Sequence, residues 1–144
     1  MVDGIDSEDS LLAGMPAVYL DTCFRCEGDW GDVPDRFALI TGYATTGETW
    51  TDAENTSADL ALEREVRRLA GWVRRITGYS PNTGFTEPGW AVSLNFETAC
   101  DLGIRFRQNA IYYVIGDALF VSYCDARRGL VEMGGFSERL TKVG

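Results

Sequence analysis

Hydrophobic and polar positions in the first third of the chain fall into short segments that predict strands. From Ala17 to Cys26, apolar and polar residues alternate, which is typical of a half-buried strand. Residues 36–43 form a nearly continuous apolar run and predict a buried strand. The stretch between them, residues 27–35, holds two Gly, one Pro and four acidic residues and predicts a loop.

The next segment has the pattern of an amphipathic helix. Leu62, Val66 and Leu69 recur at helical spacing, while charged residues occupy the opposite face. Before this stripe, Thr51 and Glu54 have the spacing of a capping box, in which each side chain accepts a hydrogen bond from the other residue's backbone amide. The pattern predicts a helix at 52–70, followed by a strand at 72–77.

The second half of the chain predicts a further helix among strands. Turn-forming residues at 78–89 indicate a loop, and Asn95 is a suitable cap for a helix that begins at Phe96. Two β-rich runs flank Gly116-Asp117, a dipeptide that suits a two-residue hairpin turn. The predicted strands of this half are 90–94, 110–115, 118–124 and an edge strand at 130–133, before a polar tail.

Together these elements predict an α+β fold. We expect a mixed or antiparallel sheet of about five to six strands with two helices packed on one face. Residues 1–15 are rich in acidic residues, Gly and Ser and predict a flexible acidic leader. Residues 16–144 then form a single domain, because 144 residues with 45% hydrophobic content suffice for one core.

Charge and composition argue against nucleic acid and membranes as partners. The net charge of −9 argues against direct electrostatic binding to nucleic acid, because such binding depends on clustered Lys and Arg. No run of about eighteen apolar residues is present, so we expect no membrane span. No signal-peptide pattern opens the sequence, and a cytoplasmic location is the expectation.

The four cysteines are expected to be reduced thiols rather than ligands. Cys23 and Cys26 have a spacing found in zinc sites, but residues three apart on a strand point to opposite faces. Cys26, Cys100 and Cys124 are therefore interpreted as small buried hydrophobic residues. The chain has no His, which removes Ser-His-Asp and Cys-His catalysis and His-ligated metals. We expect neither a metal nor a cofactor.

Carboxylate and amide side chains remain as candidates for catalysis. The candidates are Glu54, Asn55, Glu87 and Gln108, with Tyr43, Arg105 and Asn109 as neighbours. Such a set suits Mg²⁺ coordination or an acid and base pair. The capping box also explains Glu54, and amide side chains such as Gln108 commonly bond backbone groups at a helix end. Glu87 precedes Pro88, which favours an extended backbone, and it either lines a cleft or caps neighbouring amides.

Loop tryptophans and acidity support a different hypothesis. Trp30 and Trp50 lie in or beside loops, and exposed Trp is enriched at protein interfaces. The first hypothesis is a small acidic interaction protein, of the inhibitor, immunity or regulatory kind, that binds a protein partner through these two side chains. The second is a metal-assisted hydrolase or nuclease that uses Glu54 and Glu87. Small-ligand binding in a cleft between sheet and helices is a third, and the oligomeric state stays open.

Several motifs resemble a family of uncharacterised bacterial and phage proteins, domain of unknown function 3293. The likeness runs from about Ala17 to Cys124, and Ala44-Thr45 replaces the Asn-Pro that members usually have. The motifs are FALITGY at 37–43, Glu54-Asn55, the segment from Thr86 to Trp90, and LGIRFRQNAIYYV at 102–114 followed by Gly116-Asp117. The resemblance implies a compact intracellular α+β domain and no established activity.

Overall fold

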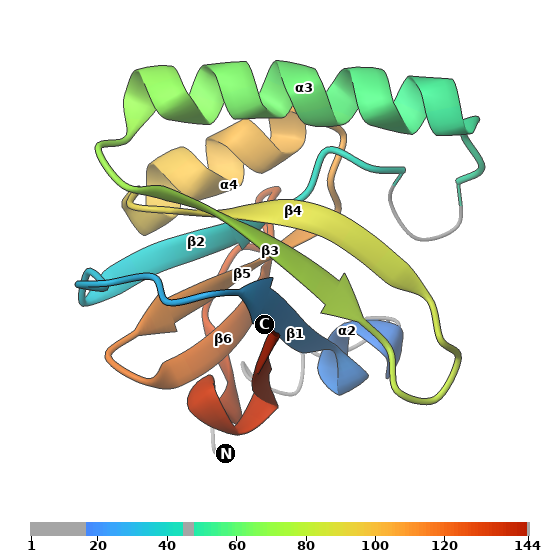
Figure 1. The fold of residues 1–144 in the computed structure, drawn as a ribbon. Coiled ribbons are helices and arrows are strands. Elements are labelled where there is room, and N and C mark those ends of the chain that lie inside the picture. Colours follow the sequence, from blue (N-terminus) through green and yellow to red (C-terminus); the bar gives the residue numbers. More distant parts are fainter. Residues whose placement is uncertain (1–16, 45–47, 144) are drawn as a thin grey trace, which may run out of the picture.

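The computed structural model describes residues 17–44 and 48–143, which form one curled sheet with helices (Figure 1). The α-helices are α2 (Ala17–Asp21), α3 (Asp52–Leu69) and α4 (Phe96–Arg105), and a 3-10 helix, η1, spans Ser137–Arg139. The strands are β1 (Cys23–Glu27), β2 (Arg36–Ile40), β3 (Val73–Tyr79), β4 (Thr86–Val92), β5 (Ala110–Ile115), β6 (Ala118–Tyr123), β7 (Val131–Gly135) and β8 (Leu140–Val143). The predicted leader, residues 1–15, lies outside the described residues.

The sheet is mixed and has the order β7-β6-β5-β2-β4-β3-β1-β8. All neighbouring strands are antiparallel except β1 and β8, which run parallel with Phe24 opposite Leu140. The two edge strands, β7 and β8, are separated in the chain by residues 136–139 alone. Such a short connection requires the sheet to curl until its edges come close, because an extended chain spans at most about 3.3–3.6 Å per residue.

The prediction of an α+β fold is confirmed, but the element counts were wrong. The described part of the chain has eight strands rather than five to six, and three α-helices rather than two. β8 escaped prediction because its residues are mostly exposed and carry no alternating pattern. Residues Ala17–Asp21 form a helix where a strand was predicted, because one turn is too short for the two periodicities to differ clearly.

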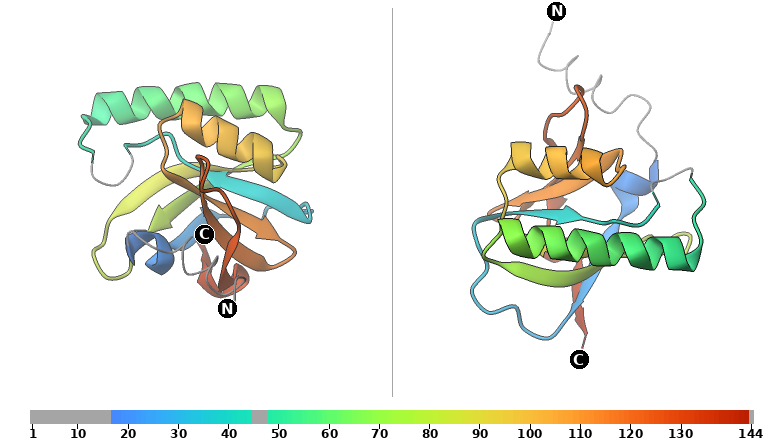
Figure 2. Two further views of the ribbon diagram at one scale, coloured as in Figure 1. Left: turned by 180° about the vertical axis from the view of Figure 1, so that it is seen from behind. Right: turned by 90° about the horizontal axis from the view of Figure 1, so that it is seen from above.

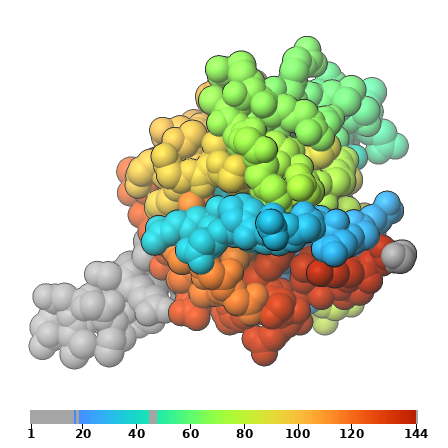
Figure 3. Space-filling view, turned by 60° about the vertical axis from the view of Figure 1, so that its left-hand side comes forward, coloured from blue at the N-terminus to red at the C-terminus, as the bar shows by residue number. Residues whose placement is uncertain are grey.

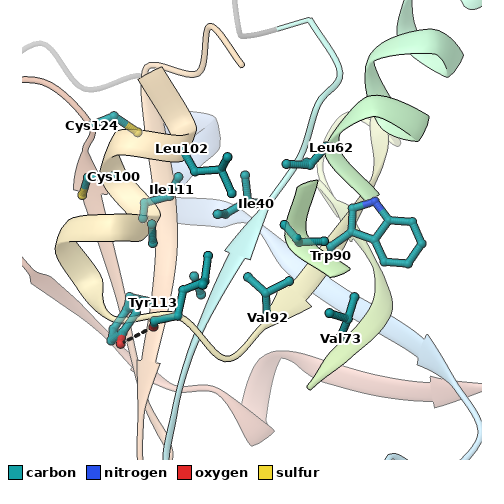
Figure 4. Close-up of a cluster of buried hydrophobic side chains, with 14 residues drawn as sticks. Ile40, Leu62, Val73, Trp90, Val92, Cys100, Leu102, Ile111, Tyr113 and Cys124 are labelled. Atoms are coloured by element: carbon teal, nitrogen blue, oxygen red, sulfur yellow. Dashed lines mark hydrogen bonds between the residues drawn. The ribbon is translucent and has the colours of Figure 1, made fainter. Parts of the chain in front are cut away.

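Helices α3 and α4 lie together on one face of the sheet, as both views in Figure 2 show. α3 contributes Leu62 and Val66 to the core beneath them, and α4 contributes Ala99 and Leu102. The sheet side of this core includes Trp90, Val92, Ile111 and Tyr113 (Figure 4), and the Tyr113 hydroxyl donates to the Leu94 carbonyl at 2.8 Å. The predicted packing of two helices on one face therefore holds for α3 and α4.

A second core fills the concave side of the curled sheet. It is rich in aromatic rings: Phe24, Trp30, Phe37 and Phe136 pack there with ring centroids 5.6–6.4 Å apart in the contacting pairs. Figure 3 shows the connection between β1 and β2, in blue to cyan, crossing between the helical layer and the C-terminal strands. Among the described residues no helix is long and apolar enough to cross a bilayer.

Arg139 connects the edge strand β7 to the segment before β1, the strand next to the other edge, and its removal is expected to destabilise the fold. Its guanidinium group donates to the carbonyls of Leu20 and Thr22 at 2.8 and 3.0 Å and to that of Met133, on β7, at 3.1 Å. Arg139→Met should lower the free energy of unfolding by about 2–4 kcal/mol, because it leaves carbonyls unpaired beside the core. Urea unfolding measures this, with Arg64→Met on the exposed side of α3 as control. Equal effects of the two substitutions would contradict the role of Arg139.

Candidate functional site

A cavity of about 80 Å³ opens at the end of the sheet where β2 and β3 finish and β4 and β5 begin. α2 and β1 close one side of it, and the turn between β3 and β4 closes another. Its described lining comprises Tyr19, Thr22, Phe24, Leu39, Ile40, Thr41, Ile76, Gly78, Tyr79, Ser80, Phe85, Glu87, Gly89, Gln108, Ala110 and Tyr112. Because Phe24, Leu39 and Ile76 also belong to the second core, the cavity is an unfilled end of that core.

Glu87 is the one carboxylate among the described lining residues. Along β4, Trp90 and Val92 face the helices while Ala91 faces the second core, so alternation directs Glu87 to the concave side. The residue opposite Glu87 on β3 is Gly78. Since Gly78 has no side chain, space remains beside the Glu87 carboxylate that any other residue would occupy.

The Glu87 carboxylate has no hydrogen-bond or ion-pair partner within the described part of the chain. Removal of this group from bulk water raises the pKa of Glu87 from 4.5 to about 7, since burial disfavours the charged form. The residue keeps part of its surface open to the cavity. The cavity therefore holds a carboxyl group that changes charge near neutral pH.

Most other polar groups of the lining are engaged in the fold. The Thr41 hydroxyl donates to the Pro88 carbonyl at 2.8 Å, and Gln108 Nε2 donates to the Tyr43 carbonyl at 2.7 Å. The Tyr112 hydroxyl donates to the Tyr19 carbonyl at 2.7 Å and lies 2.8 Å from Thr22 Oγ1. Ser80 resembles Glu87, because its hydroxyl has no partner among the described residues although the side chain is buried.

The four candidate catalytic residues separate into two groups. Glu87 and Gln108 both line the cavity, whereas Glu54 and Asn55 do not belong to its described lining. The predicted capping box of α3 is confirmed: Glu54 Oε1 accepts from the Thr51 amide at 2.9 Å, and Thr51 Oγ1 accepts from the Glu54 amide at 3.1 Å. Asn55 Oδ1 accepts from the Ala44 amide at 2.8 Å and so holds the loop after β2 against α3.

Potential metal ligands do not gather in the part of the chain that the structure describes. No group of three or more Asp, Glu, Cys or His side chains there is placed to hold an ion. Cys26 is buried and Cys23 is only half-buried, as expected for opposite faces of β1. Cys100 of α4 and the neighbouring Cys124 are buried, and desolvation raises their pKa values to about 11 and about 12. Such thiols are poor nucleophiles at neutral pH.

Trp30 is buried, whereas the hypothesis of a protein partner needs an exposed side chain at this position. Its side chain is 6% exposed and packs in the second core, with its ring 5.4 Å from that of Trp72 and 6.2 Å from that of Phe37. Burial of such a large apolar ring in the core stabilises the fold, and this favours the core over an exposed position. The loop at 28–35 is long enough to place the ring there. Trp50, which precedes the cap of α3, is half-buried.

Sequence reasoning missed the cavity walls Gly78 and Ser80. A loop was predicted at 78–89, whereas Gly78 belongs to β3, and β3 and β4 form a hairpin in which Tyr79 pairs with Thr86. Ser80 does lie in the turn, directly after β3. Pro88 lies within β4 and made the strand hard to recognise, because proline lacks an amide donor. Had the hairpin been recognised, the alternation from Trp90 back to Glu87 would have assigned Glu87 to the concave face.

The fold and the cavity define this chain as an α+β domain with a small, mainly apolar cavity at the end of a curled sheet. Residues 40–111, half of the chain, match the family described as Protein of unknown function (DUF3293), and the chain belongs to that family. The matched segment includes Gly78, Ser80, Glu87 and Gln108, but is shorter than the resemblance noted from the motifs. Comparisons with curated proteins and with solved structures found no match.

Glu87 is expected to make the stability of the protein depend on pH. The folded protein keeps this proton up to about pH 7, whereas the group's ordinary pKa is 4.5. As pH rises through this window the unfolded chain releases the proton first, so the free energy of unfolding falls. Glu87→Gln removes the free-energy cost of ionising this buried group and should stabilise the protein by about 1–3 kcal/mol at pH of about 8. The range follows from about 1.4 kcal/mol per unit of pKa shift, reduced because the side chain is partly exposed. The advantage should vanish at pH of about 4.5.

The matched control for that measurement is Glu54→Gln. A hydrogen bond from the Thr51 backbone amide lowers the pKa of Glu54, so its contribution to stability is present at neutral pH and is lost as the solution becomes acidic. Denaturant unfolding of the three proteins across pH should therefore show opposite trends for the two variants. A pH-independent difference between Glu87→Gln and the unsubstituted protein would show that the Glu87 carboxyl is not desolvated.

Trp30 is expected to be a stability residue. Trp30→Ala leaves a large void in the aromatic core and should cost about 3–5 kcal/mol of unfolding free energy. Trp50→Ala should cost clearly less, because Trp50 is only half-buried. Thermal and urea unfolding compare the two variants directly. Similar losses from both substitutions would contradict this assignment.

Proposed function

We propose that this protein is a non-enzymatic binding protein that holds a small ligand in the cavity at the end of its sheet. The observation that carries the proposal is a mainly apolar cavity whose lining includes the Glu87 carboxylate and the Ser80 hydroxyl, both without hydrogen-bond partners among the described residues. Ligand sites typically combine apolar walls with a few convergent polar groups that fix the orientation of the ligand. A carboxyl group with a strongly shifted pKa in a cleft is a further feature of such sites.

The cavity is formed at a cost to the fold, which supports a role in binding. An unpaired carboxyl group beside a hydrophobic core disfavours folding, and an apolar residue at position 87 would extend the second core instead. A bound ligand that pairs with Glu87 would offset this cost and stabilise the folded protein. A ligand site gives a physical reason for Glu87 that a purely structural role does not.

The hypothesis of a protein partner stays a second proposal. Its support is the net charge of −9 together with Phe85, which is 55% exposed at the cavity. Trp50 remains a candidate contact, but the buried Trp30 is replaced by Phe85 as the exposed aromatic residue. The metal-assisted hydrolase has less support, because Glu54 belongs to a helix cap rather than to the cavity lining.

Filling the cavity tests the first proposal. At Gly78 an added Cβ would meet Thr22 Cγ2 at 3.5 Å and Phe24 Cε1 at 3.7 Å, which are ordinary contacts, so Gly78→Val should fold while occupying the cavity. Ligand-observed NMR with a library of small fragments should give binders of the unsubstituted protein that Gly78→Val does not bind. The expected loss is at least about tenfold in affinity, or about 1.4 kcal/mol.

The control for Gly78→Val is Gly71→Val. An added Cβ at Gly71 would meet nothing within 4 Å, and this glycine is exposed outside the cavity. Fragments that occupy the cavity should bind Gly71→Val as they bind the unsubstituted protein. A library without any binder, or binders unaffected by Gly78→Val, would show that the cavity is not a ligand site.

A further inference from the structure

Glu87 is a carboxylate without a counter-charge in its cavity. None of the described lining residues is Lys or Arg, and positions 1–16, 45–47 and 144 carry neither residue in the sequence. Arg139 and Arg25 lie on neighbouring elements, but both are engaged elsewhere. Arg139 donates to three backbone carbonyls, and the Arg25 guanidinium stacks 5.5 Å from the centre of the Tyr79 ring.

The surroundings of Glu87 favour a positively charged ligand over a neutral or a negative one. Aromatic side chains account for much of the apolar wall, and the faces of aromatic rings attract cations. These aromatic residues are Tyr19, Phe24, Tyr79, Phe85 and Tyr112. The net charge of −9 raises the local concentration of cations and repels anions. A carboxylate in a low-dielectric cavity also interacts more strongly with a cation than an exposed carboxylate does.

We propose that the cavity binds the ammonium group of an aliphatic amine, with the Glu87 carboxylate as its counter-ion and the alkyl chain against the apolar wall. This inference rests on the proposed ligand-binding function and specifies the chemistry of the ligand. A cavity of about 80 Å³ accommodates about three to four non-hydrogen atoms, since about 150 Å³ holds benzene. A longer chain would extend past the exposed Phe85. Free amines and lysine side chains share this alkylammonium chemistry.

The protonation of Glu87 should control this binding. The charged and titratable groups that neighbouring elements contribute around Glu87 are Tyr19 and Asp21 of α2, Arg25 of β1, Tyr79 of β3, Tyr112 of β5 and Arg139 of η1. Asp21 accepts a hydrogen bond from Asn82 at 3.4 Å, and burial raises the pKa of Tyr112 far above neutral pH. Glu87, with a pKa of about 7, is therefore the group that changes charge in the cavity between pH of about 6 and 8.

The test uses n-butylammonium chloride, with 1-butanol as the neutral probe of similar shape and butanoate as the negative one. Titration calorimetry or ligand-observed NMR at pH of about 8 should give at least tenfold tighter binding of butylammonium than of 1-butanol, and the weakest binding for butanoate. Glu87→Gln should abolish the preference for butylammonium. In the unsubstituted protein, butylammonium affinity should rise about tenfold from pH of about 6 to 8, because the amine stays charged while Glu87 ionises.

Three results would overturn the ammonium inference. They are equal binding of butylammonium and 1-butanol, an unchanged preference in Glu87→Gln, and an affinity for butylammonium that does not rise with pH. Fragment binding that Gly78→Val still abolishes would then leave the ligand-binding function standing, so the two failures are distinguishable. If butylammonium binds as expected, its affinity is compared with that of a capped glycine-lysine-glycine peptide, to distinguish a free amine from a lysine side chain as the natural ligand. Tighter binding of the peptide indicates a lysine of a partner protein, and tighter binding of the amine indicates a free metabolite.

Discussion

The closure of the curled sheet is the constraint on which the rest of the structure depends. β7 and β8 are the two edges of the sheet, yet only residues 136–139 separate them along the chain. Arg139, at the end of this connection, donates to the Met133 carbonyl in the edge strand β7 and to the Leu20 and Thr22 carbonyls just before β1, the strand that pairs with the other edge, β8. Because the sheet is held curled, its concave side encloses an aromatic core instead of facing water.

The cavity follows from this curvature. Residues on the concave side converge, so that Phe24 of β1 reaches the same space as Leu39 and Tyr112 of the paired strands β2 and β5. Gly78 contributes no side chain opposite Glu87, and the core stops short of the sheet end there. The helical face differs, because α3 and α4 cover it with closely packed Leu, Val and Ala side chains. One sheet thus has one face filled by helices and another with room for a ligand.

The polar groups around the cavity are of two kinds, those with hydrogen-bond partners in the fold and those without. Gln108, Thr41 and Asn55 hold the loop after β2 through hydrogen bonds to backbone groups, which accounts for them without any ligand. Glu87 and Ser80 have no such partners among the described residues. This contrast, rather than the residue types alone, directs the functional proposal to Glu87. The same contrast distinguishes Glu87 from Glu54, because the Glu54 carboxylate accepts a hydrogen bond from the Thr51 amide at the start of α3.

The sequence by itself determined those elements that depend only on residues close together in the chain. The capping box of Thr51 and Glu54, the Asn95 cap and the Gly116-Asp117 hairpin depend on residues near one another in the chain, and all three are present. Only the tertiary structure decided the placement of Trp30, the strand β8 and the space beside Glu87. Each of these depends on contacts between segments far apart in sequence: Trp30 with Phe136, Phe24 with Leu140, and Glu87 with a cavity whose walls span Tyr19 to Tyr112. Hydrophobic patterning shows that a side chain is apolar or faces one side of a strand, but burial is decided by what packs against that side.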